Sequence, residues 1–281
     1  MLTVRNYRRD LEAFAAWFCR RTATAEFDVA SVEAQDISDW IIYRLDTAQL
    51  APATMNREIS SLRSFFKYMR RVGVITRDPL LRIGSLKAPK TLPVFVPHTR
   101  MEELLESVGE QSHEPDFQQQ RDSIIISLLY GCGIRLAELL GIHLADISDG
   151  SVKIFGKGGK HRFVPLLPEL EQRIERYIAL CREQGIRFGD DLLIVGATGR
   201  PLSRSTVQRI VARQMSEAGV QGRKSPHVLR HTFATELLGE GADMREIQEL
   251  MGHSSLSSTQ HYTHTDIRQL QGAYGKAHPH K

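Results

Sequence analysis

The chain has 281 residues and a formal net charge of +4 at pH 7, with 37 Lys and Arg against 33 Asp and Glu. Its hydrophobic content of 41% is enough to give two domains of ordinary size a buried core each, which excludes an intrinsically disordered chain. The mild positive charge favours a polyanionic partner, but it equally fits a protein with a solvated surface.

The cysteines and the start of the chain indicate a cellular compartment. Cys19, Cys132 and Cys181 are irregularly spaced and odd in number, so they predict neither a disulfide framework nor a cysteine-based zinc site. The first residues contain no apolar stretch typical of a signal peptide. The longest uncharged apolar run, residues 123–134, is shorter than the roughly 20 residues of a membrane helix and predicts a core helix instead. We therefore expect a cytoplasmic protein.

Positive charge is concentrated in the first third of the chain. Residues 1–90 hold 15 Lys and Arg against 10 Asp and Glu, whereas residues 91–281 hold 22 against 23. Arginine supplies 28 of the 37 basic side chains. This preference suits phosphate recognition, because a guanidinium group can bind two oxygens at once.

Residues 2–72 predict a run of helices, because apolar residues recur at three- and four-residue spacing. The clearest helix is residues 54–72, with an apolar stripe that consists of Met55, Ile59, Leu62, Phe66 and Met69. Residues 57–90 hold nine basic and two acidic side chains, so this segment either follows a phosphate backbone or is a solvated helix face. On the first interpretation the candidate DNA-binding residues are Arg57, Arg63, Lys67, Arg70, Arg71, Lys87 and Lys90.

The prolines between residues 79 and 97 predict a linker, with a domain boundary near residue 90. Helical periodicity resumes near residue 99. Residues 151–166 predict a β-hairpin, because two short runs of β-branched and aromatic residues flank a glycine-rich turn. Most of the remaining chain again has helical periodicity.

The predicted hairpin turn and the segment before it each carry a candidate cation. The turn lacks the spacing of a phosphate-binding loop, so Lys157 either reaches into a DNA groove or is an ordinary solvated residue. Lys160 is a further candidate for DNA contact. Arg135 begins a helical pattern after an apolar helix, where a charge is costly without a partner. That partner is either an anion or Glu138, one helical turn away.

His227 and Arg230 follow a Ser-Pro pair that is typical of a helix start. Because they are three residues apart, they share one helix face and can address one anion together. His227 and His231 also have the spacing of zinc proteases. However, Val228 stands where such a protease needs glutamate, which argues against that chemistry.

The last candidates are His253 and Tyr262, which lie nine residues apart. A lone tyrosine among histidines is usually a packing or surface residue. Here it completes a set of cationic side chains with a nucleophile, and no acidic cluster for Mg²⁺ accompanies it.

This set resembles the active site of the tyrosine recombinase (phage integrase) family, and the resemblance covers nearly the whole chain. The matching positions, in the order of the family, are Arg135, Lys157, His227, Arg230, His253 and Tyr262. Residues 270–280 are more similar to the end of the bacterial Xer recombinases than to that of phage integrases. Residues 3–11 resemble the second half of the N-terminal motif, and the helix that usually precedes them is missing, so the natural start lies upstream or this part is shortened.

The resemblance implies a mainly α fold with a small β-sheet, like that of type IB topoisomerases. It implies an N-terminal helical, SAM-like core-binding domain over residues 1–78, a linker over 79–97 and a mostly α catalytic domain over 98–264. Residues 265–281 would form a tail that docks into a neighbouring protomer.

The resemblance also implies that Tyr262 attacks the scissile phosphate, leaving a 3′-phosphotyrosyl bond and a free 5′-hydroxyl. Lys157 would be the general acid for the 5′-oxygen, with Lys160 as the substitute. No metal ion and no cofactor is implied.

The remaining residues would act on the phosphate and on the nucleophile. Arg135 and Arg230 would bind the non-bridging oxygens, and His253 would donate a further hydrogen bond. His227 would assist proton transfer from the tyrosine.

The partners implied are a double-stranded chromosomal recombination site, a related recombinase in a homo- or hetero-tetramer and the septal DNA translocase, with no membrane. The implied role is resolution of chromosome dimers at chromosome partition and cell division. The alternatives are a mobile-element integrase of the same family, a DNA-binding protein that does not cut, and a metal hydrolase built on His227, His231 and His253.

Overall fold

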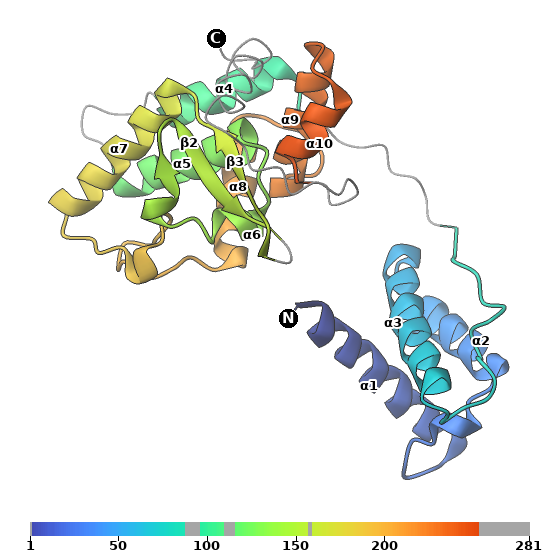
Figure 1. Cartoon of the computed structure of the whole chain (residues 1–281). Helices are drawn as coiled ribbons and strands as arrows, with labels where there is room; N and C mark the ends of the chain where they lie inside the picture. Colours follow the sequence, from blue (N-terminus) through green and yellow to red (C-terminus); the bar gives the residue numbers. More distant parts are fainter. Residues whose placement is uncertain (1, 88–95, 110–115, 157–158, 253–281) are drawn as a thin grey trace. The chain divides into compact units, whose positions relative to one another are not determined.

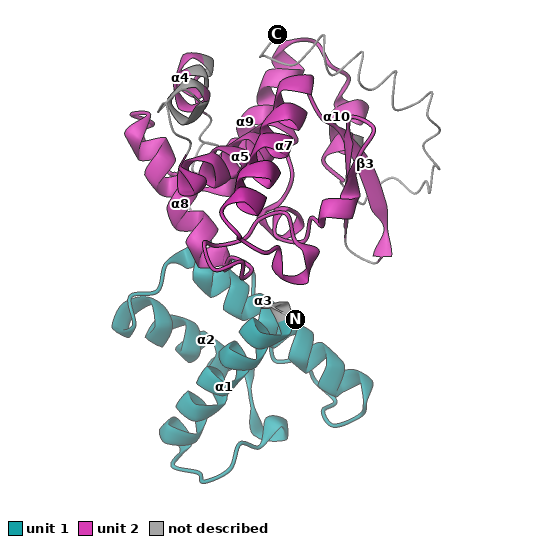
Figure 2. Ribbon diagram, turned by 90° about the vertical axis from the view of Figure 1, so that its left-hand side faces the viewer, with its two compact units in different colours: residues 1–91 teal, residues 92–281 magenta. Residues whose placement is uncertain are grey.

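The computed structural model describes residues 2–87, 96–109, 116–156 and 159–252. The chain divides into two compact units, residues 1–91 and residues 92–281, each with its own hydrophobic core (Figures 1 and 2). The linker expected at residues 79–97 spans this division.

Unit 1 is helical, as the periodicity of residues 2–72 predicts. In chain order its elements are α1 (Leu2–Thr22), the 3-10 turn η1 (Val29–Ser31), α2 (Ala34–Ile42), the π-helical turn η2 (Tyr43–Thr47) and α3 (Pro52–Arg71). The helix expected at residues 54–72 is confirmed as α3, although it begins two residues earlier. Pro52 occupies the first helical turn, where its fixed φ is suitable and its missing N–H costs nothing.

An aromatic core joins the helices of unit 1. The ring of Phe14 on α1 meets Trp40 on α2 edge-on, with centroids 5.7 Å apart, and Phe66 on α3 at 6.4 Å. The apolar stripe expected on α3 is buried against this core, with Met55 and Leu62 fully inaccessible. The basic residues of α3 are thereby directed away from the core.

Ion pairs with buried carboxylates connect α3 to α1 and to η2 beside this core. Asp10 on α1 is 3% exposed and accepts hydrogen bonds from Arg57 and from Ser61 Oγ, the latter at 2.8 Å. Glu58, also 3% exposed, accepts from Arg44 Nε at 3.0 Å. Each carboxylate is therefore paired where burial would otherwise be costly.

Replacing Asp10 by alanine tests the first of these pairs. We expect a loss of about 2 kcal/mol in the unfolding free energy of unit 1, less than the roughly 3–5 kcal/mol of a fully buried pair because Arg57 keeps 33% exposure. Urea titration followed by tryptophan fluorescence measures it, since both tryptophans lie in unit 1. The exposed Glu12→Ala on the same helix should stay within about 0.5 kcal/mol, and equal effects of the two variants would contradict this prediction.

Unit 2 is built around a central buried helix, α5. Its helices are α4 (His98–Gly109), α5 (Phe117–Gly131), α6 (Leu136–Leu139), α7 (Pro168–Glu183), α8 (Arg204–Glu217), α9 (Pro226–Gly239) and α10 (Met244–Leu250), with 3-10 turns η3 (Leu144–Asp146) and η5 (Gly189–Asp191). Helix α5 packs against α4, α7, α8 and α9, which together enclose it (Figure 1). The core helix expected at residues 123–134 is therefore confirmed, ending at Gly131.

A small antiparallel sheet lies beside these helices, with strand order β1 (Ile147–Ser148), β2 (Ser151–Phe155) and β3 (His161–Pro165). The hairpin expected at residues 151–166 is confirmed as β2 and β3, which pair with Ile154 opposite Arg162. Alternate side chains of β3 face the core, so Arg162 and Val164 are buried while His161 is exposed.

Two further expectations can be compared with the described residues. The three cysteines are free thiols, as their spacing predicts. Within the described ranges, no helix is both long enough and apolar enough to cross a membrane.

Candidate active site

The site begins where the chain leaves α5 and enters the short helix α6. Arg135 is the N-cap of α6, and its backbone N–H donates to Glu138 Oε2 at 2.9 Å. Its side chain reaches the same carboxylate, with Nη1 2.7 Å from Oε1. The ion pair that the sequence offered as one interpretation of Arg135 is therefore present, but it is part of a larger network.

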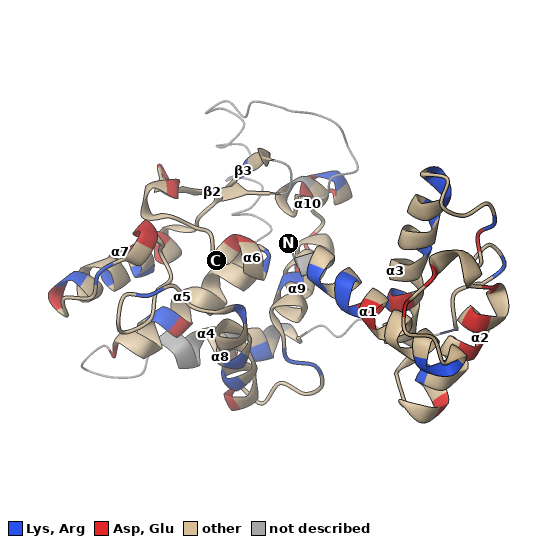
Figure 3. Cartoon of the chain, turned by 90° about the horizontal axis from the view of Figure 1, so that it is seen from below, with Lys and Arg blue, Asp and Glu red and all other residues tan. Residues whose placement is uncertain are grey.

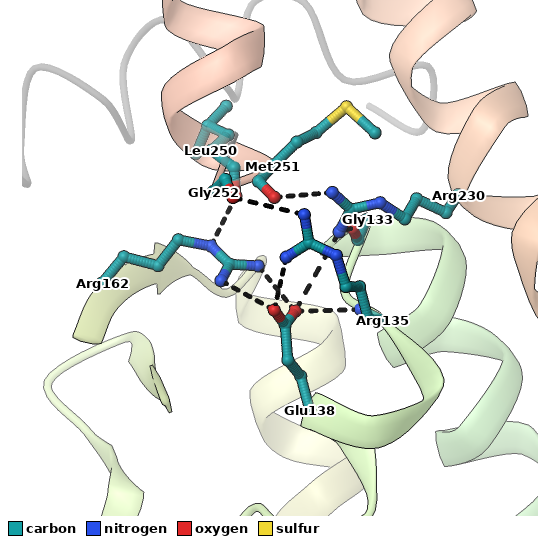
Figure 4. A network of polar contacts seen from close by, with 8 residues as sticks. All are labelled: Gly133, Arg135, Glu138, Arg162, Arg230, Leu250, Met251 and Gly252. Atoms are coloured by element: carbon teal, nitrogen blue, oxygen red, sulfur yellow. Dashed lines mark hydrogen bonds and ion pairs between the residues drawn. The ribbon is translucent and has the colours of Figure 1, made fainter. Parts of the chain in front are cut away.

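A second arginine binds the same carboxylate from the sheet. Arg162 Nη2 donates to Glu138 Oε2 at 2.9 Å and Nη1 to Oε1 at 3.3 Å, which is a two-point contact between guanidinium and carboxylate (Figure 4). Both side chains are buried, Glu138 with 6% and Arg162 with 10% of the side chain exposed.

A third arginine arrives from α9. Arg230 Nη1 donates to the carbonyl of Gly133 and lies 4.0 Å from Glu138 Oε2. Its side chain is 7% exposed, whereas that of Arg135 is 39% exposed. Three guanidinium groups from three separate elements therefore surround one carboxylate.

The same three arginines bind successive carbonyl groups at the end of α10. Arg162 Nε donates to Leu250 O at 2.7 Å, Arg230 Nη2 to Met251 O at 2.5 Å, and Arg135 Nη2 to Gly252 O at 3.2 Å (Figure 4). The last carbonyls of a helix lack intrahelical donors and carry partial negative charge, so cations stabilise them. The network thus fixes the position of the chain just before residue 253.

Close backbone packing permits this convergence at Gly133. Its φ is +56°, and a Cβ atom there would lie 2.3 Å from the ring of Phe233 on α9. Any other residue would separate the turn after α5 from α9, and the Gly133 carbonyl would move away from Arg230.

The charges in the network shift the ionisation of its members. Burial alone would raise the pKa of Glu138, but the hydrogen bonds and charge of Arg162, together with Arg135, bring it below its ordinary value. Burial, with the repulsion of Arg135 and Arg162, lowers the pKa of Arg230 to about 10, and Glu138 partly opposes that shift. Glu138 is therefore ionised and Arg230 is charged at neutral pH.

The site consequently has three positive charges against one negative charge. An additional anion would relieve the repulsion among the guanidinium groups, and Arg135 is the group most accessible to it. Arginine forks in a poorly hydrated setting are suited to the non-bridging oxygens of a phosphodiester.

The structure brings together only part of the predicted set. Arg135 and Arg230 meet at the network, whereas His227, although on the same helix as Arg230, is exposed. Lys160 is also exposed, directly before the strand that carries Arg162. The remaining predicted residues, Lys157, His253 and Tyr262, lie outside the described residues, as do the expected tail at 265–281 and the metal alternative that depends on His253.

The DNA-binding candidates of unit 1 fall into two groups. Arg57 is bound to Asp10, and Arg63 Nη2 donates to Ile83 O at 2.7 Å, so both have contacts within the unit. The exposed members are Lys67, Arg70, Arg71 and Lys87. Figure 3 shows basic residues gathered toward the end of α3. Lys90 lies outside the described residues.

Sequence reasoning missed Arg162. A signal was available, because in strand β3 it alternates with the exposed His161 and the half-buried Phe163 and shares the face of Val164. A charged residue at a position of the core-facing pattern requires a partner. Its partner, Glu138, could not be identified from the sequence because it lies 24 residues earlier.

Cys132 is the nucleophile nearest to the network in sequence. It is fully buried, and burial raises the pKa of its thiol to about 12, although the charge of Arg162 opposes the shift. At neutral pH it is therefore a protonated thiol and does not compete as a nucleophile.

The comparisons with known proteins agree over almost the whole chain. A model of the phage integrase family matches residues 95–269, and a model of the phage integrase N-terminal SAM-like domain matches residues 1–73. The tyrosine recombinase XerC of Thermodesulfovibrio yellowstonii is 36% identical, over 99% of this chain and 90% of that protein. The tyrosine recombinase XerD of Oceanobacillus iheyensis is 34% identical, over 99% and 92% respectively.

Solved structures support the fold. The XerH recombinase bound to a palindromic difH substrate has a TM-score of 0.74, with 24% identity over 97% of this chain and 79% of that chain. A lambda integrase dimer on a core site has a TM-score of 0.66, with 17% identity over 93% of each chain. The mainly α fold with a small sheet and a SAM-like N-terminal domain is confirmed.

The shared carboxylate provides a test of the network by pH. At pH 7, Glu138→Gln should lower the unfolding free energy of unit 2 by about 3 kcal/mol, because Arg162 stays buried without its counter-ion. The folded pKa of Glu138 lies below its unfolded value, so this stabilisation is present above about pH 4.3 and is lost as the pH falls through the folded pKa. The difference between the two proteins should therefore shrink toward pH 3.

Urea unfolding at each pH, read by pulse hydrogen exchange at one fixed labelling pH, reports on α5 and β3 in unit 2. The exposed Glu183→Gln serves as a control and should remain within about 0.5 kcal/mol of the parent. A stability difference for Glu138→Gln that stays constant from pH 7 to pH 3 would refute the ionised carboxylate.

Proposed function

This chain belongs to the phage integrase family of site-specific DNA recombinases, and from that membership we propose that it cuts and rejoins DNA through a covalent bond between Tyr262 and a 3′-phosphate. The observation that carries the proposal is the meeting of Arg135 and Arg230 at one carboxylate, with positive charge in excess. The chain leaves this network at Gly252, directly before the segment that contains His253 and Tyr262.

The proposed reaction exchanges one phosphate ester for another. The phenol oxygen of Tyr262 forms a bond to phosphorus, and the bond between phosphorus and the 5′-oxygen breaks. The phenol loses its proton, with assistance from His227, and the departing 5′-oxygen gains one from Lys157. Because the ester is conserved, the 5′-hydroxyl of a partner strand can reverse the step without ATP.

The arginines supply the electrostatic part of catalysis. Negative charge increases on the non-bridging oxygens as the phosphorus becomes five-coordinate, and fixed guanidinium groups bind that state more strongly than the ground state. Arg135 and Arg230 are suited to this because hydrogen bonds to Gly252 and Met251 already hold them in position. His253 would add a donor next to them.

The assignment of Lys157 as general acid is supported by its place in the sequence. In the sequence it falls between β2 and β3, and β3 carries Arg162 into the network. Strand β3 is therefore anchored beside the arginines, and Lys157 is four residues before it in the sequence. Lys160 on the same turn is exposed and is the substitute.

We further propose that the cellular role is resolution of chromosome dimers at cell division, on a chromosomal site in the cytoplasm. Support comes from relatives named XerC and XerD at 34–36% identity over 99% of this chain. The same proposal includes assembly as a homo- or hetero-tetramer, with residues 265–281 docking between protomers. It also includes control by the septal DNA translocase. The domain limits proposed are 1–78, 79–97 and 98–264.

The nucleophile is tested by covalent trapping on a nicked duplex that carries candidate chromosomal sites. In the presence of EDTA, the parent chain should form an adduct on the 3′ side of the cut that persists on a denaturing gel, and Tyr262→Phe should form none. Arg135→Ala should slow adduct formation by about 10²–10³-fold, the usual cost of one transition-state donor. Failure of the parent chain to form an adduct on DNA that it binds would favour the non-cutting alternative.

The exposed basic residues of α3 are tested by salt dependence. Replacing Lys67, Arg70 and Arg71 by glutamine should weaken DNA binding and reduce the slope of log K against log salt by about 0.9 for every phosphate that the variant no longer neutralises. The matched control is Arg20→Gln, an exposed arginine on α1. An unchanged slope in the triple variant, measured by fluorescence anisotropy, would show that α3 has a solvated face instead.

A further inference from the structure

We propose that Arg162 is a positioning residue for the strand-cleavage reaction: it acts through Glu138 and the end of α10 to hold Arg135 and the chain before residue 253 in their reactive positions. The inference rests on the proposed function, because it assigns Arg135 and Arg230 to the scissile phosphate. Arg162 itself is not assigned a contact with DNA.

The contacts of Arg162 connect three elements. Its side chain leaves β3, meets both oxygens of Glu138 at the end of α6, and donates from Nε to Leu250 O at the end of α10. All three guanidinium nitrogens are therefore used inside the protein. A group 10% exposed with every nitrogen bound in this way is a structural connector within the site.

Glu138 connects Arg162 to Arg135, because its carboxylate accepts hydrogen bonds from both residues. Oε1 accepts from both Arg162 Nη1 and Arg135 Nη1, and Oε2 accepts from Arg162 Nη2 and the backbone N–H of Arg135. Without Arg162, the carboxylate would keep only the two hydrogen bonds from Arg135 and could rotate with that remaining partner. Arg135 would then no longer have a single fixed orientation.

The second connection is to the end of α10. Arg162 also limits the space at Gly252, where φ is +63° and a Cβ atom would lie 2.9 Å from Arg162 Nη1. The guanidinium therefore packs closely against the residue that precedes His253. Loss of Arg162 would release Leu250 O and leave a gap at Gly252.

The geometry of the side chain matters as well as its charge. A lysine at position 162 could supply one positive charge, but a single ammonium group cannot reproduce the planar fork that spans both carboxylate oxygens and a carbonyl. We therefore expect Arg162→Lys to behave like Arg162→Gln in catalysis, even if it is the more stable of the two.

Unit 2 offers a matched control in Arg121. It is 7% exposed and paired with a buried carboxylate, but that carboxylate is Asp122 on α5, which also binds Arg213. Arg121→Gln removes a buried arginine from the same unit without altering the network around Glu138. It reports what loss of such an ion pair does through stability alone.

The experiment compares single-turnover cleavage of two nicked duplexes by the full-length chain. One has an ordinary scissile phosphate, and the other has a methylphosphonate, in which a methyl group replaces one non-bridging oxygen and removes the charge that Arg135 and Arg230 would bind. The rate on each substrate is measured with the same preparation, so that the ratio of the two rates does not depend on the fraction of folded protein.

Arg162→Gln and Arg162→Lys should slow cleavage of the ordinary phosphate by about 10–100-fold, the scale expected when a reacting group is displaced by about 1 Å. On the methylphosphonate the loss should fall below about threefold, because a misplaced arginine matters less to a neutral centre. Arg121→Gln should change both rates by one common factor.

Three outcomes would overturn the inference. The first is that the Arg162 variants lose the same factor in cleavage rate on both substrates. The second is that Arg162→Gln cleaves the ordinary phosphate at the rate of the parent chain. The third is that Arg162→Lys restores the full cleavage rate. If the parent chain forms no adduct, while binding the DNA, the proposed function itself is overturned and this inference with it. If the parent chain cleaves the DNA and Arg162→Gln cleaves it at the same rate, only this inference is overturned and the proposed function stands.

Discussion

The carboxylate of Glu138 is the charge on which the arrangement of the site depends. Three buried or partly buried guanidinium groups could not lie so close to one another without it, because their mutual repulsion and the cost of burial would separate them. One carboxylate is enough to hold the arginines together and too little to neutralise them. The remaining positive charge makes the site suited to a phosphodiester. The pKa of Arg230 is lowered mainly by burial and, to a smaller extent, by the charges of the neighbouring arginines.

The arginines of this network also bind the carbonyl groups at the end of α10. Carbonyl groups that would otherwise lack donors accept from Arg162, Arg230 and Arg135 in succession, so elements from four parts of unit 2 share one set of hydrogen bonds. This construction explains why a glycine is required at residue 133, where the turn after α5 packs against α9. Under the proposed function it also couples the fold to the reaction, because the sequence continues from these carbonyls toward Tyr262. Under the proposed function, stability and catalysis at this site depend on the same side chains.

Much of this could be predicted from local patterns, and the remainder depends on contacts between distant segments. The spacing of apolar residues was sufficient to predict α3 and α5, and two short apolar runs around a glycine-rich turn were sufficient to predict the β2–β3 hairpin. These signals are local in the sequence. The family pattern named Arg135 and Arg230, which the structure brings together at Glu138. It did not indicate that His227 would be exposed while Arg230, on the same helix, is buried, since that difference is set by packing against the turn at Gly133. Arg162 was missed because its partners, Glu138 and Leu250, lie 24 and 88 residues away in the sequence. The two-residue strand β1 and the four-residue helix α6 are likewise too short for a periodic signal.

The central claim is that the arginines gathered by Glu138 receive the scissile phosphate. The most direct measurement is a crystal structure of Tyr262→Phe bound to an uncut recombination site, because this variant keeps every group of the network. We predict one phosphate with non-bridging oxygens in hydrogen-bond contact with the guanidinium groups of Arg135 and Arg230, while Glu138 still binds Arg162. A DNA-bound structure in which the phosphates avoid Arg135 and Arg230, or in which Glu138 has left Arg162, would contradict it.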